Sequence, residues 1–543
     1  MGRAHAAAVA AGDLVASPLP ETVVEEPRDE GHGHFAANLA LLLARPNRRS
    51  PRQVAEVLAA HLPPDGITDL QGVEVAGPGF LNFFFRPGWL APVVDEVLRD
   101  QTAYGYSQVG AGQRVLVEFV SANPTGPLNV VNCRAAAFGD SLVRCLRAAG
   151  YAAEAEYYVN DAGGQFRKLG MSLAARLRQT RGEDAPLPDG GYPGEYLVEL
   201  ARQYAGAHGY AVLEEPADQA AAHLARHGVE AMLRQQQATL ERFRVAYDHF
   251  TLESDVRAAG GPERVVRALE GAGHTVVRDG ALWLLSQAAG DNDDRVLRKQ
   301  DGEYTYRVPD IAYHAEKFER GYDHLVDIYG QDHHGEVPAV RIALAWLGYP
   351  VERLEVLLTQ IIRLVRDGGD PERISKRQGT FITMDEFLDE VGVDAARYFF
   401  VMRTIDTHMD FDIDLARRQS QENPVYYVQY AHARISSILR QAGDVQPGAG
   451  AGGLLTHPAE ESLCRALAML PDEIAAAALS RAPHRLTAYA RLAAERFHSF
   501  YVQCRVLGED AELSRARLGL CLATRTVLAQ VLGLLGVTAP DTM

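Results

Sequence analysis

The fold is decided by residues 113–161, QRVLVEFVSANPTGPLNVVNCRAAAFGDSLVRCLRAAGYAAEAEYYVND. Residues 113–120 form an apolar run of strand length that contains one carboxylate, Glu118, near its end. A loop rich in turn-forming residues follows, then an amphipathic helical pattern that ends at Gly150, and then a second strand pattern. This order of strand, loop, helix and strand predicts one βαβ unit of a parallel sheet.

Polar side chains gather in the loop and the first helical turn of this unit. Because ligands of parallel sheets bind beyond the carboxyl ends of the strands, we expect these side chains to line one crevice. They are Glu118, Ser121, Asn123, Asn129 and Asn132. Alternatively, the Asn, Pro and Gly residues of this loop serve only to build the turn.

The patterns along the rest of the chain predict three domains. Residues 1–110 are predicted to form a small α+β domain, with two helices and two strands around a Gly-Pro-Gly turn. Residues 111–385 are predicted to form the α/β domain, which is interrupted by a mostly helical insertion over about 165–295. Residues 386–543 are predicted to be almost all helical, with a loop or linker at QPGAGAGG (446–453).

Composition and charge narrow the class of protein. The chain is 47% hydrophobic, as in globular proteins, and its net charge of −17 argues against non-specific nucleic-acid binding over the whole surface. Residues 417–543 hold 13 arginines against 11 acidic residues, which allows a polyanionic partner there or is an ordinary fluctuation between domains. The five cysteines are scattered without a CxxC pair, so neither a disulfide framework nor a zinc site is predicted. No signal peptide or membrane-spanning stretch is evident, and we expect a cytoplasmic protein without a membrane partner.

The chain lacks the motifs of the commonest nucleotide-binding and hydrolytic sites. No GxxxxGK[ST], HExxH or GxSxG segment occurs. What remains is a set of residues spread along the chain. A carboxylate such as Glu118 at the end of an apolar strand should meet a cation, which is either a protein side chain or a ligand. Tyr306 and Asp310 would share one face of a helix, and the three side chains together would suit a guanidinium group.

A basic cluster, Arg373-Ile374-Ser375-Lys376-Arg377, lies in a glycine-rich segment. Such a segment can close on a polyphosphate and neutralise charge that develops in a transition state. The alternative is a solvated charged loop. Only four of the 54 basic residues are lysines, Lys168, Lys299, Lys317 and Lys376, so a lysine in this cluster favours a specific role for its ammonium group.

Eight segments, in this order along the chain, resemble the bacterial arginyl-tRNA synthetases. They are VEFVSANPTGPLNVVNCRAAAFGD (117–140), YYVNDAGGQ (157–165), DGEYTYRVPDIAYH (301–314), IYGQDHHG (328–335), RISKRQGTFIT (373–383), EVGVDAARYFF (390–400), NPVYYVQYAHARI (423–435) and FHSFYVQCRVL (497–507). The resemblance extends from about residue 20 to Met543. It implies a class I synthetase with a Rossmann-like catalytic domain, a helical insertion, an N-terminal domain that contacts the tRNA elbow and a helical anticodon-binding domain.

The resemblance also implies the reaction and its participants. Enzymes of this family form arginyl-adenylate from ATP and L-arginine and transfer the arginine to the terminal ribose of tRNA(Arg), and they require bound tRNA before they activate arginine. Mg²⁺ is expected to accompany ATP, and no metal site of the protein's own is expected. A monomer is expected because the relatives are usually monomers.

Site residues follow from the resemblance, position by position. The residues implied for arginine are Glu118, Ser121, Asn123, Tyr306, Asp310 and Gln331. Those implied for ATP are Pro127, Leu128, Asn129, Asn132, Gly330, Asp332, His333, Ile374 and Lys376. Catalytic roles are implied for Asn129, Asn132, Ser375, Lys376 and Arg377, with Lys376 as the phosphate-binding lysine. The residues implied for tRNA are Asn38, Tyr426, Tyr430, His432 and Arg434, although packing inside the helical bundle would explain each of the last four equally well.

One motif departs from the family. Most relatives have HVGH where this chain has Asn129-Val130-Val131-Asn132. The family's histidines donate hydrogen bonds to the phosphates of ATP, whereas asparagine keeps an N–H donor but never becomes cationic. Val131 is expected to crowd the place where the family's glycine meets adenine. Three hypotheses remain open: an active divergent synthetase, a weakened or specialised paralogue, and a non-enzymatic tRNA-binding protein.

Overall fold

The computed structural model describes most of the chain. The described residues are 1–20, 24–25, 27, 30–62, 69–331, 334–366, 382–448 and 452–543. They group into two compact units. One unit holds residues 1–99, 442–468 and 499–523, and the other holds residues 100–441, 469–498 and 524–543. The three domain boundaries drawn from the sequence stay a prediction.

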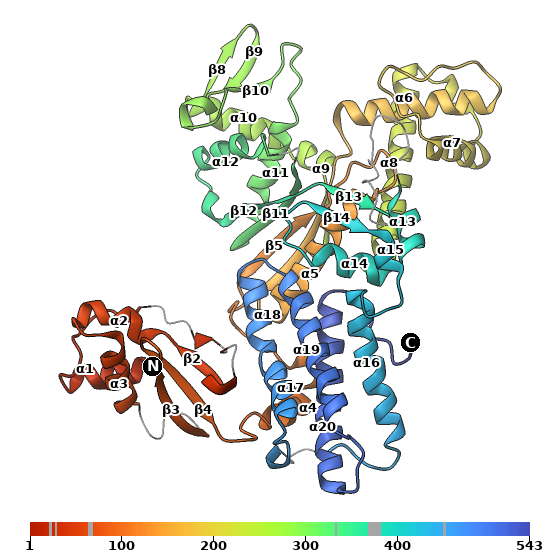
Figure 1. Ribbon diagram of the computed structural model, residues 1–543. Coiled ribbons are helices and arrows are strands. Elements are labelled where there is room, and N and C mark those ends of the chain that lie inside the picture. Colours follow the sequence, from red (N-terminus) through yellow and green to blue (C-terminus); the bar gives the residue numbers. More distant parts are fainter. Residues whose placement is uncertain are drawn as a thin grey trace. The chain divides into compact units, whose positions relative to one another are not determined.

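The first unit contains a small antiparallel sheet with helices packed on it (Figure 1). The strand order is β1 (Val24–Glu25), β2 (Phe35–Ala37), β4 (Phe80–Phe85) and β3 (Leu70–Ala76). The helices are α1 (Gly2–Ala10), α2 (Leu39–Asn47), α3 (Pro51–Ala60), the first part of α4 (Pro92–Asp100) and α17 (Pro458–Ala468). Leu43 of α2, Leu58 of α3 and Leu81 of β4 belong to one apolar core. Ser50 begins α3 with a capping box to Gln53, which is why this helix starts where it does.

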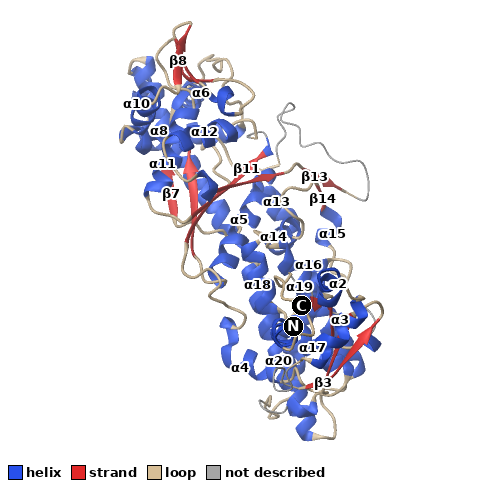
Figure 2. Ribbon diagram, turned by 90° about the vertical axis from the view of Figure 1, so that its left-hand side faces the viewer, coloured by secondary structure: helices blue, strands red, loops and turns tan. Residues whose placement is uncertain are grey.

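The second unit is built on a five-stranded parallel sheet. Its strand order is β12 (Leu354–Thr359), β11 (His324–Gly330), β5 (Arg114–Phe119), β6 (Ala152–Val159) and β7 (His249–Leu252). Helix α5 (Val130–Ala148) connects β5 to β6 and lies beside the sheet, which is red in Figure 2. The predicted βαβ unit is therefore confirmed. Gly139 lets α5 approach β5 closely, because a Cβ there would lie 2.3 Å from the ring of Phe119.

The insertion between β6 and α11 is less helical than its sequence predicts. Its helices are α6 (Gly163–Thr180), α7 (Glu195–His208), α8 (Ala217–Arg242), α9 (Glu253–Ala258) and α10 (Gly261–Gly271). However, β7 returns to the parallel sheet, and β8 (Thr275–Arg278), β9 (Ala281–Leu284) and β10 (Arg295–Arg298) form a separate antiparallel sheet (Figure 1). Each of these strands has four residues, which is too short for the alternation that reveals a strand in sequence.

Helices dominate the remainder of this unit. They are α11 (Arg307–Glu319), α12 (Val337–Trp346), α13 (Met384–Val391), α14 (Val393–Val401), α15 (Ile413–Arg417), α16 (Pro424–Gln441) and α18 (Leu470–Leu479). Helices α19 (His484–Gln503) and α20 (Ala511–Leu534) have residues in both units. The region after Val391, predicted to be almost all helical, also contributes β14 (Met409–Asp412), which pairs in parallel with β13 (Ile362–Val365).

Helix α20 bears on the expectation that no stretch of the chain spans a membrane. Within the described part of the chain, it alone is long and apolar enough to cross a membrane, with a mean hydropathy of 1.3. In the protein, however, 61% of that apolar stretch is buried, as in the central helix of a soluble bundle. Length and composition therefore do not make α20 a membrane segment.

Buried arginines fix α5 to the helices behind it. Arg134 donates to the carbonyl oxygens of Thr404 and Thr407, each at 2.7 Å. Arg397 of α14 pairs with Asp140 of α5. Because both arginines are fully buried, these contacts hold the helix that begins at the candidate site in a fixed position.

Candidate active site

A cavity of about 1690 Å³ opens beyond the carboxyl ends of β5, β11 and β12. Every residue predicted to bind arginine or ATP that the structure describes contributes to its lining. These residues are Glu118, Ser121, Asn123, Pro127, Leu128, Asn129, Asn132, Tyr306, Asp310, Gly330 and Gln331. Asp332, His333, Ile374, Ser375, Lys376 and Arg377 lie outside the described residues. The parallel sheet thus brings together side chains that are more than 200 positions apart in sequence, because its strands end at one edge.

The lining of the cavity is acidic. Its carboxylates are Glu118, Glu195, Glu253, Asp310, Glu336 and Glu386, and among the described residues Arg341 is the arginine that joins them. Such a lining favours a cationic ligand. In the described part of the chain, no group of three His, Cys, Asp or Glu residues is arranged to hold a metal ion.

Three buried carboxylates stand side by side under this cavity. Asp327 of β11, Glu118 of β5 and Glu156 of β6 are paired across the sheet in register, so they lie in one row. Helix α11 and its C-cap residue neutralise the row. Lys317 contacts both Glu118 and Asp327, the latter at 2.8 Å, and Arg320 contacts Glu156 at 2.7 Å. All of these groups except Arg320 are buried, and each charge is compensated by a neighbour.

His314 extends this network toward the cavity. Its Nε2 lies 2.8 Å from Asp327 Oδ2, and its Nδ1 lies 3.2 Å from Asp310 Oδ1. Burial and Lys317 lower the pKa of His314, but Asp310 and Asp327 outweigh them and raise it to about 10. The imidazole is therefore a cation at neutral pH. The carboxylate of Asp310 remains one-third exposed and is the accessible acid of this network.

The cation expected beside Glu118 is a protein side chain. Besides Lys317, the hydroxyl of Ser121 donates to Glu118 Oε1 at 2.8 Å. Burial raises the pKa of Glu118, whereas the two carboxylates raise the pKa of Lys317 in spite of burial. Of the two alternatives left open by the sequence, the structure shows the protein cation. Asp310 lies one turn of α11 after Tyr306, pairs with His314 and keeps about one-third of its side chain exposed.

The motif Asn129-Val130-Val131-Asn132 forms the beginning of α5. Asn129 Oδ1 accepts a hydrogen bond from the backbone N–H of Val131, and Asn132 Oδ1 accepts one from the backbone N–H of Asn129, both at 3.0 Å. This reciprocal pair is a capping box. Because each side-chain oxygen faces a backbone N–H, the amide nitrogen Nδ2 of each asparagine is the atom left to donate at the cavity.

The same motif is joined to the segment that follows the basic cluster. The backbone N–H of Val130 donates to the carbonyl oxygen of Ile382 at 3.2 Å, and that of Met384 donates to the carbonyl oxygen of Leu128 at 2.8 Å. Thr383 then begins α13 with a capping box of its own. The end of residues 373–383 is thereby fixed beside the start of α5.

Comparison with known proteins decides the family. Three family profiles match the chain: the arginyl tRNA synthetase N-terminal domain over residues 4–85, the class I (R) tRNA synthetase catalytic domain over 93–404, and the DALR anticodon-binding domain over 428–543. The arginine–tRNA ligase of Moorella thermoacetica is 48% identical over 99% of this chain and 97% of its own length. That of Symbiobacterium thermophilum is 46% identical over 99% of this chain and 96% of its own length. The chain belongs to the arginyl-tRNA synthetase family.

The solved structures agree with this assignment at the level of the fold. The Thermus thermophilus arginyl-tRNA synthetase matches with a TM-score of 0.75 at 24% identity, over 99% of each chain. The predicted architecture, a class I catalytic domain with a small N-terminal domain and a helical C-terminal domain, is confirmed. No observation favours the two alternative hypotheses, a weakened paralogue or a non-enzymatic tRNA-binding protein.

The residues that replace the family's HVGH have different surroundings in the structure. Val131 is 41% exposed and lines the cavity, where most arginyl-tRNA synthetases have glycine according to the sequence resemblance. The two asparagines, by contrast, have a definite local role, because they cap the helix that carries them. The motif is therefore an ordered helix start rather than a disrupted one.

The residues predicted to contact tRNA differ in accessibility. Tyr426, Tyr430 and Arg434 follow one another along α16, with the Tyr426 and Tyr430 rings 6.3 Å apart and the Arg434 guanidinium 5.9 Å from the Tyr430 ring. His432 is buried, and its Nδ1 lies 2.8 Å from the carbonyl oxygen of Pro540. Packing inside the bundle, the alternative stated above, accounts for His432. Asn38 is the N-cap residue of α2.

Sequence reasoning missed the groups that support the site. Lys317 and His314 were not selected, although Lys317 is one of four lysines and follows Asp310 by two helical turns. A scarce lysine two turns after a predicted site residue on the same helix could have indicated Lys317. Gln236 and Tyr196 were also missed, and no sequence signal reveals them because their partners are backbone carbonyl groups.

Proposed function

We propose that this protein activates L-arginine with ATP and joins the arginine to the 3′ end of tRNA(Arg). The observation that carries the proposal is the single cavity in which an accessible carboxylate, Asp310, and the start of α5 are both exposed. A cationic guanidinium suits the first, and the phosphates of ATP suit the second.

At the arginine end, Asp310 is the direct partner of the guanidinium. Glu118 and Asp327 are already neutralised by Lys317, so they shape and support the pocket. Tyr306, Asn123 and Gln331 lie on the same cavity and hold the rest of the amino acid. A neutral analogue such as citrulline would add no cation beside the exposed side of Asp310, which gives the pocket its selectivity.

At the ATP end, the amide nitrogens of Asn129 and Asn132 donate to the phosphates. The backbone N–H groups of Asn129, Val130 and Val131 already have partners within the protein, so they do not serve this purpose. Pro127, Leu128 and Gly330 line the nucleotide's position. Asp332, His333, Ile374, Ser375, Lys376 and Arg377 keep the roles implied by the family resemblance. Mg²⁺ would accompany ATP and offset part of the charge of its phosphates.

The chemistry needs no covalent enzyme intermediate. A carboxylate oxygen of arginine attacks the α-phosphorus of ATP, a new O–P bond forms, and pyrophosphate leaves with the electrons of the broken bond. A ribose hydroxyl of the tRNA terminus then attacks the activated carbonyl carbon, and AMP leaves. The protein contributes orientation and fixed hydrogen-bond donors. Because the reaction belongs to translation, we propose a cytoplasmic location. The resemblance to the family implies a monomer.

The test is arginine-dependent ATP–pyrophosphate exchange, with and without tRNA(Arg). Robust exchange that requires both arginine and tRNA supports the proposal. The matched variant carries Asn129→His, Val131→Gly and Asn132→His together. No exchange by the wild type, with tRNA still bound and activity restored by the variant, would show that the chemistry is lost in this motif and would overturn the proposal.

A further inference from the structure

The loop of residues 120–126, which follows β5, is held in a conformation that its own residues disfavour. Val120 and Ser121 have φ angles of +70° and +37°, a region that glycine adopts easily and β-branched residues rarely adopt. Such residues persist there only where the surroundings fix them. Because Ser121 and Asn123 belong to the proposed arginine site, whatever fixes this loop also fixes that site.

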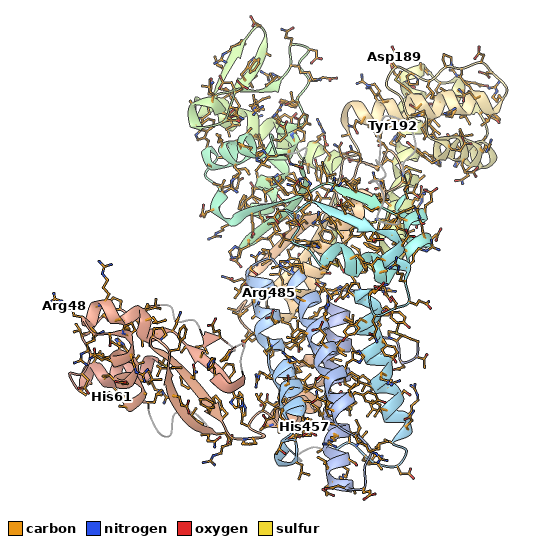
Figure 3. The ribbon with its side chains drawn as sticks, viewed as in Figure 1. Arg48, His61, Asp189, Tyr192, His457 and Arg485 are labelled. Carbon is orange, nitrogen blue, oxygen red and sulfur yellow. The ribbon has the colours of Figure 1, made fainter. Side chains whose placement is uncertain are left out.

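Two side chains of the helical insertion donate hydrogen bonds to the backbone carbonyl groups of this loop. Gln236 of α8 donates through Nε2 to the carbonyl oxygens of Asn123 and Gly126, at 3.1 and 2.8 Å. Tyr196 of α7 donates its hydroxyl to the carbonyl oxygen of Thr125 at 2.6 Å. The start of the segment that leads into α7 can be found in Figure 3 by the labels Asp189 and Tyr192.

These contacts are built into the site. Gln236 is 1% exposed, and its Oε1 accepts a hydrogen bond from the hydroxyl of Tyr157 at 2.9 Å, so both ends of the amide are engaged. Tyr196 approaches so closely that a Cβ on Gly126 would lie 3.2 Å from its hydroxyl, and one on Gly194 would lie 2.2 Å from its ring. A third insertion helix, α6, adds a weaker contact through Gln165, which accepts the side-chain amide of Asn123 at 2.8 Å.

We propose that Gln236 and Tyr196 are positioning residues for arginine. They hold residues 120–126 in the binding conformation before the substrate arrives, so that the placement of α7 and α8 sets the affinity for arginine. The inference rests on the proposed function, since it concerns the arginine site, and it assigns the insertion a part in that site. A loop that must be ordered on binding lowers affinity, whereas a pre-ordered loop does not.

The experiment compares Gln236→Leu and Tyr196→Phe with two matched controls. Gln179 and Tyr210 lie in the same insertion but bond elsewhere, Gln179 to the carbonyl oxygen of Ala185 and Tyr210 to Thr180, so Gln179→Leu and Tyr210→Phe remove the same groups away from the loop. We would measure the arginine Kd by calorimetry in the presence of tRNA, KM and kcat in pyrophosphate exchange, and the unfolding temperature. We expect Gln236→Leu to raise the arginine Kd and KM about tenfold and Tyr196→Phe about threefold, with kcat near the wild-type value.

Each outcome decides a different claim. If the wild type binds no arginine and shows no exchange, the proposed function fails. If the wild type is active and neither loop variant changes the arginine Kd, or the controls change it equally, the positioning role fails. A fall in unfolding temperature and kcat with an unchanged KM would indicate a structural role only and would also overturn it. Tyr196→Phe removes one hydroxyl and keeps the test decisive if Gln236→Leu does not fold.

Discussion

The two ends of the cavity differ in how their polar side chains are held in place. Under the proposed arginine end, Glu118, Asp327, Lys317 and His314 are buried charges that fix one another. At the start of α5, neutral amides are fixed by backbone N–H groups. A network of buried charges is strong but fails when one member is removed, whereas a capping box tolerates exchange for another capping residue. The difference predicts which substitutions lower the free energy of unfolding and which change only substrate binding or kcat.

The largest expected effect is that of Lys317→Met. Removing the ammonium group strands two buried carboxylates, which typically costs about 3–5 kcal/mol of stability. Urea unfolding would measure this loss. Lys299→Met is the control, because Lys299 pairs with Glu303 at the surface and should contribute less than about 1 kcal/mol. Equal stability of the two variants would show that the buried network does not support the fold.

Asp310→Ala should chiefly weaken arginine binding. A hydrogen bond to a charged group contributes about 1.5–3 kcal/mol, so the arginine KM should rise by roughly ten- to a hundredfold. The KM for ATP should stay near its wild-type value, because the start of α5 is unchanged. Steady-state exchange kinetics would test this, with Glu319→Ala on the same helix as the control. An unchanged arginine KM would place the guanidinium elsewhere.

The pH dependence of stability should reveal His314. Its pKa in the folded protein, about 10, lies above the ordinary value of 6.5. The protonated form is therefore favoured by folding, and this contribution is complete below about pH 6.5 and is lost as the pH rises toward 10. Unfolding free energies of the wild type should fall across this window more steeply than those of His314→Gln. Parallel pH profiles would mean that His314 is neutral in the folded protein.

The smallest effects on stability are expected at Asn129. Asn129→Asp keeps the capping oxygen but loses the Nδ2 donor, so stability should hold while kcat for exchange falls. Asn129→Ala loses the cap as well and should cost a further ~1 kcal/mol of stability. Thermal unfolding and exchange kinetics of the pair would separate the two roles. A wild-type kcat in both variants would overturn the donor role, and equal stability of the two variants would overturn the capping role.

The sequence predicted the sheet and the location of the site better than its internal contacts. The βαβ unit followed from residues 113–161, because an apolar strand and an amphipathic helix have clear periods. The sequence indicated Glu118, near the end of an apolar strand, and Asp310, one helical turn from Tyr306, as site residues. It did not indicate which cation pairs with Glu118. Lys317 lies about 200 positions away in the chain, and only the register of β5 against β11 brings Asp327 and Glu118 under one lysine.

Short elements and backbone contacts account for the rest. Strands β7 to β10 were missed because four residues show no period. Gln236 and Tyr196 were missed because they bind carbonyl groups, which every residue carries. The role of Asn129 and Asn132 was underestimated for a different reason. The comparison with HVGH emphasised the missing imidazoles. The three-residue spacing of Asn129 and Asn132, which is that of a capping box, was visible in the sequence.

The reciprocity of that capping box has an evolutionary consequence. Asn132 accepts a hydrogen bond from the backbone N–H of Asn129, and Asn129 accepts one from that of Val131, so a histidine at either position removes one half of the box. The two sites are therefore epistatic. A change from asparagines to histidines one position at a time would pass through an intermediate with only half of the box, in which α5 begins with one capping bond fewer.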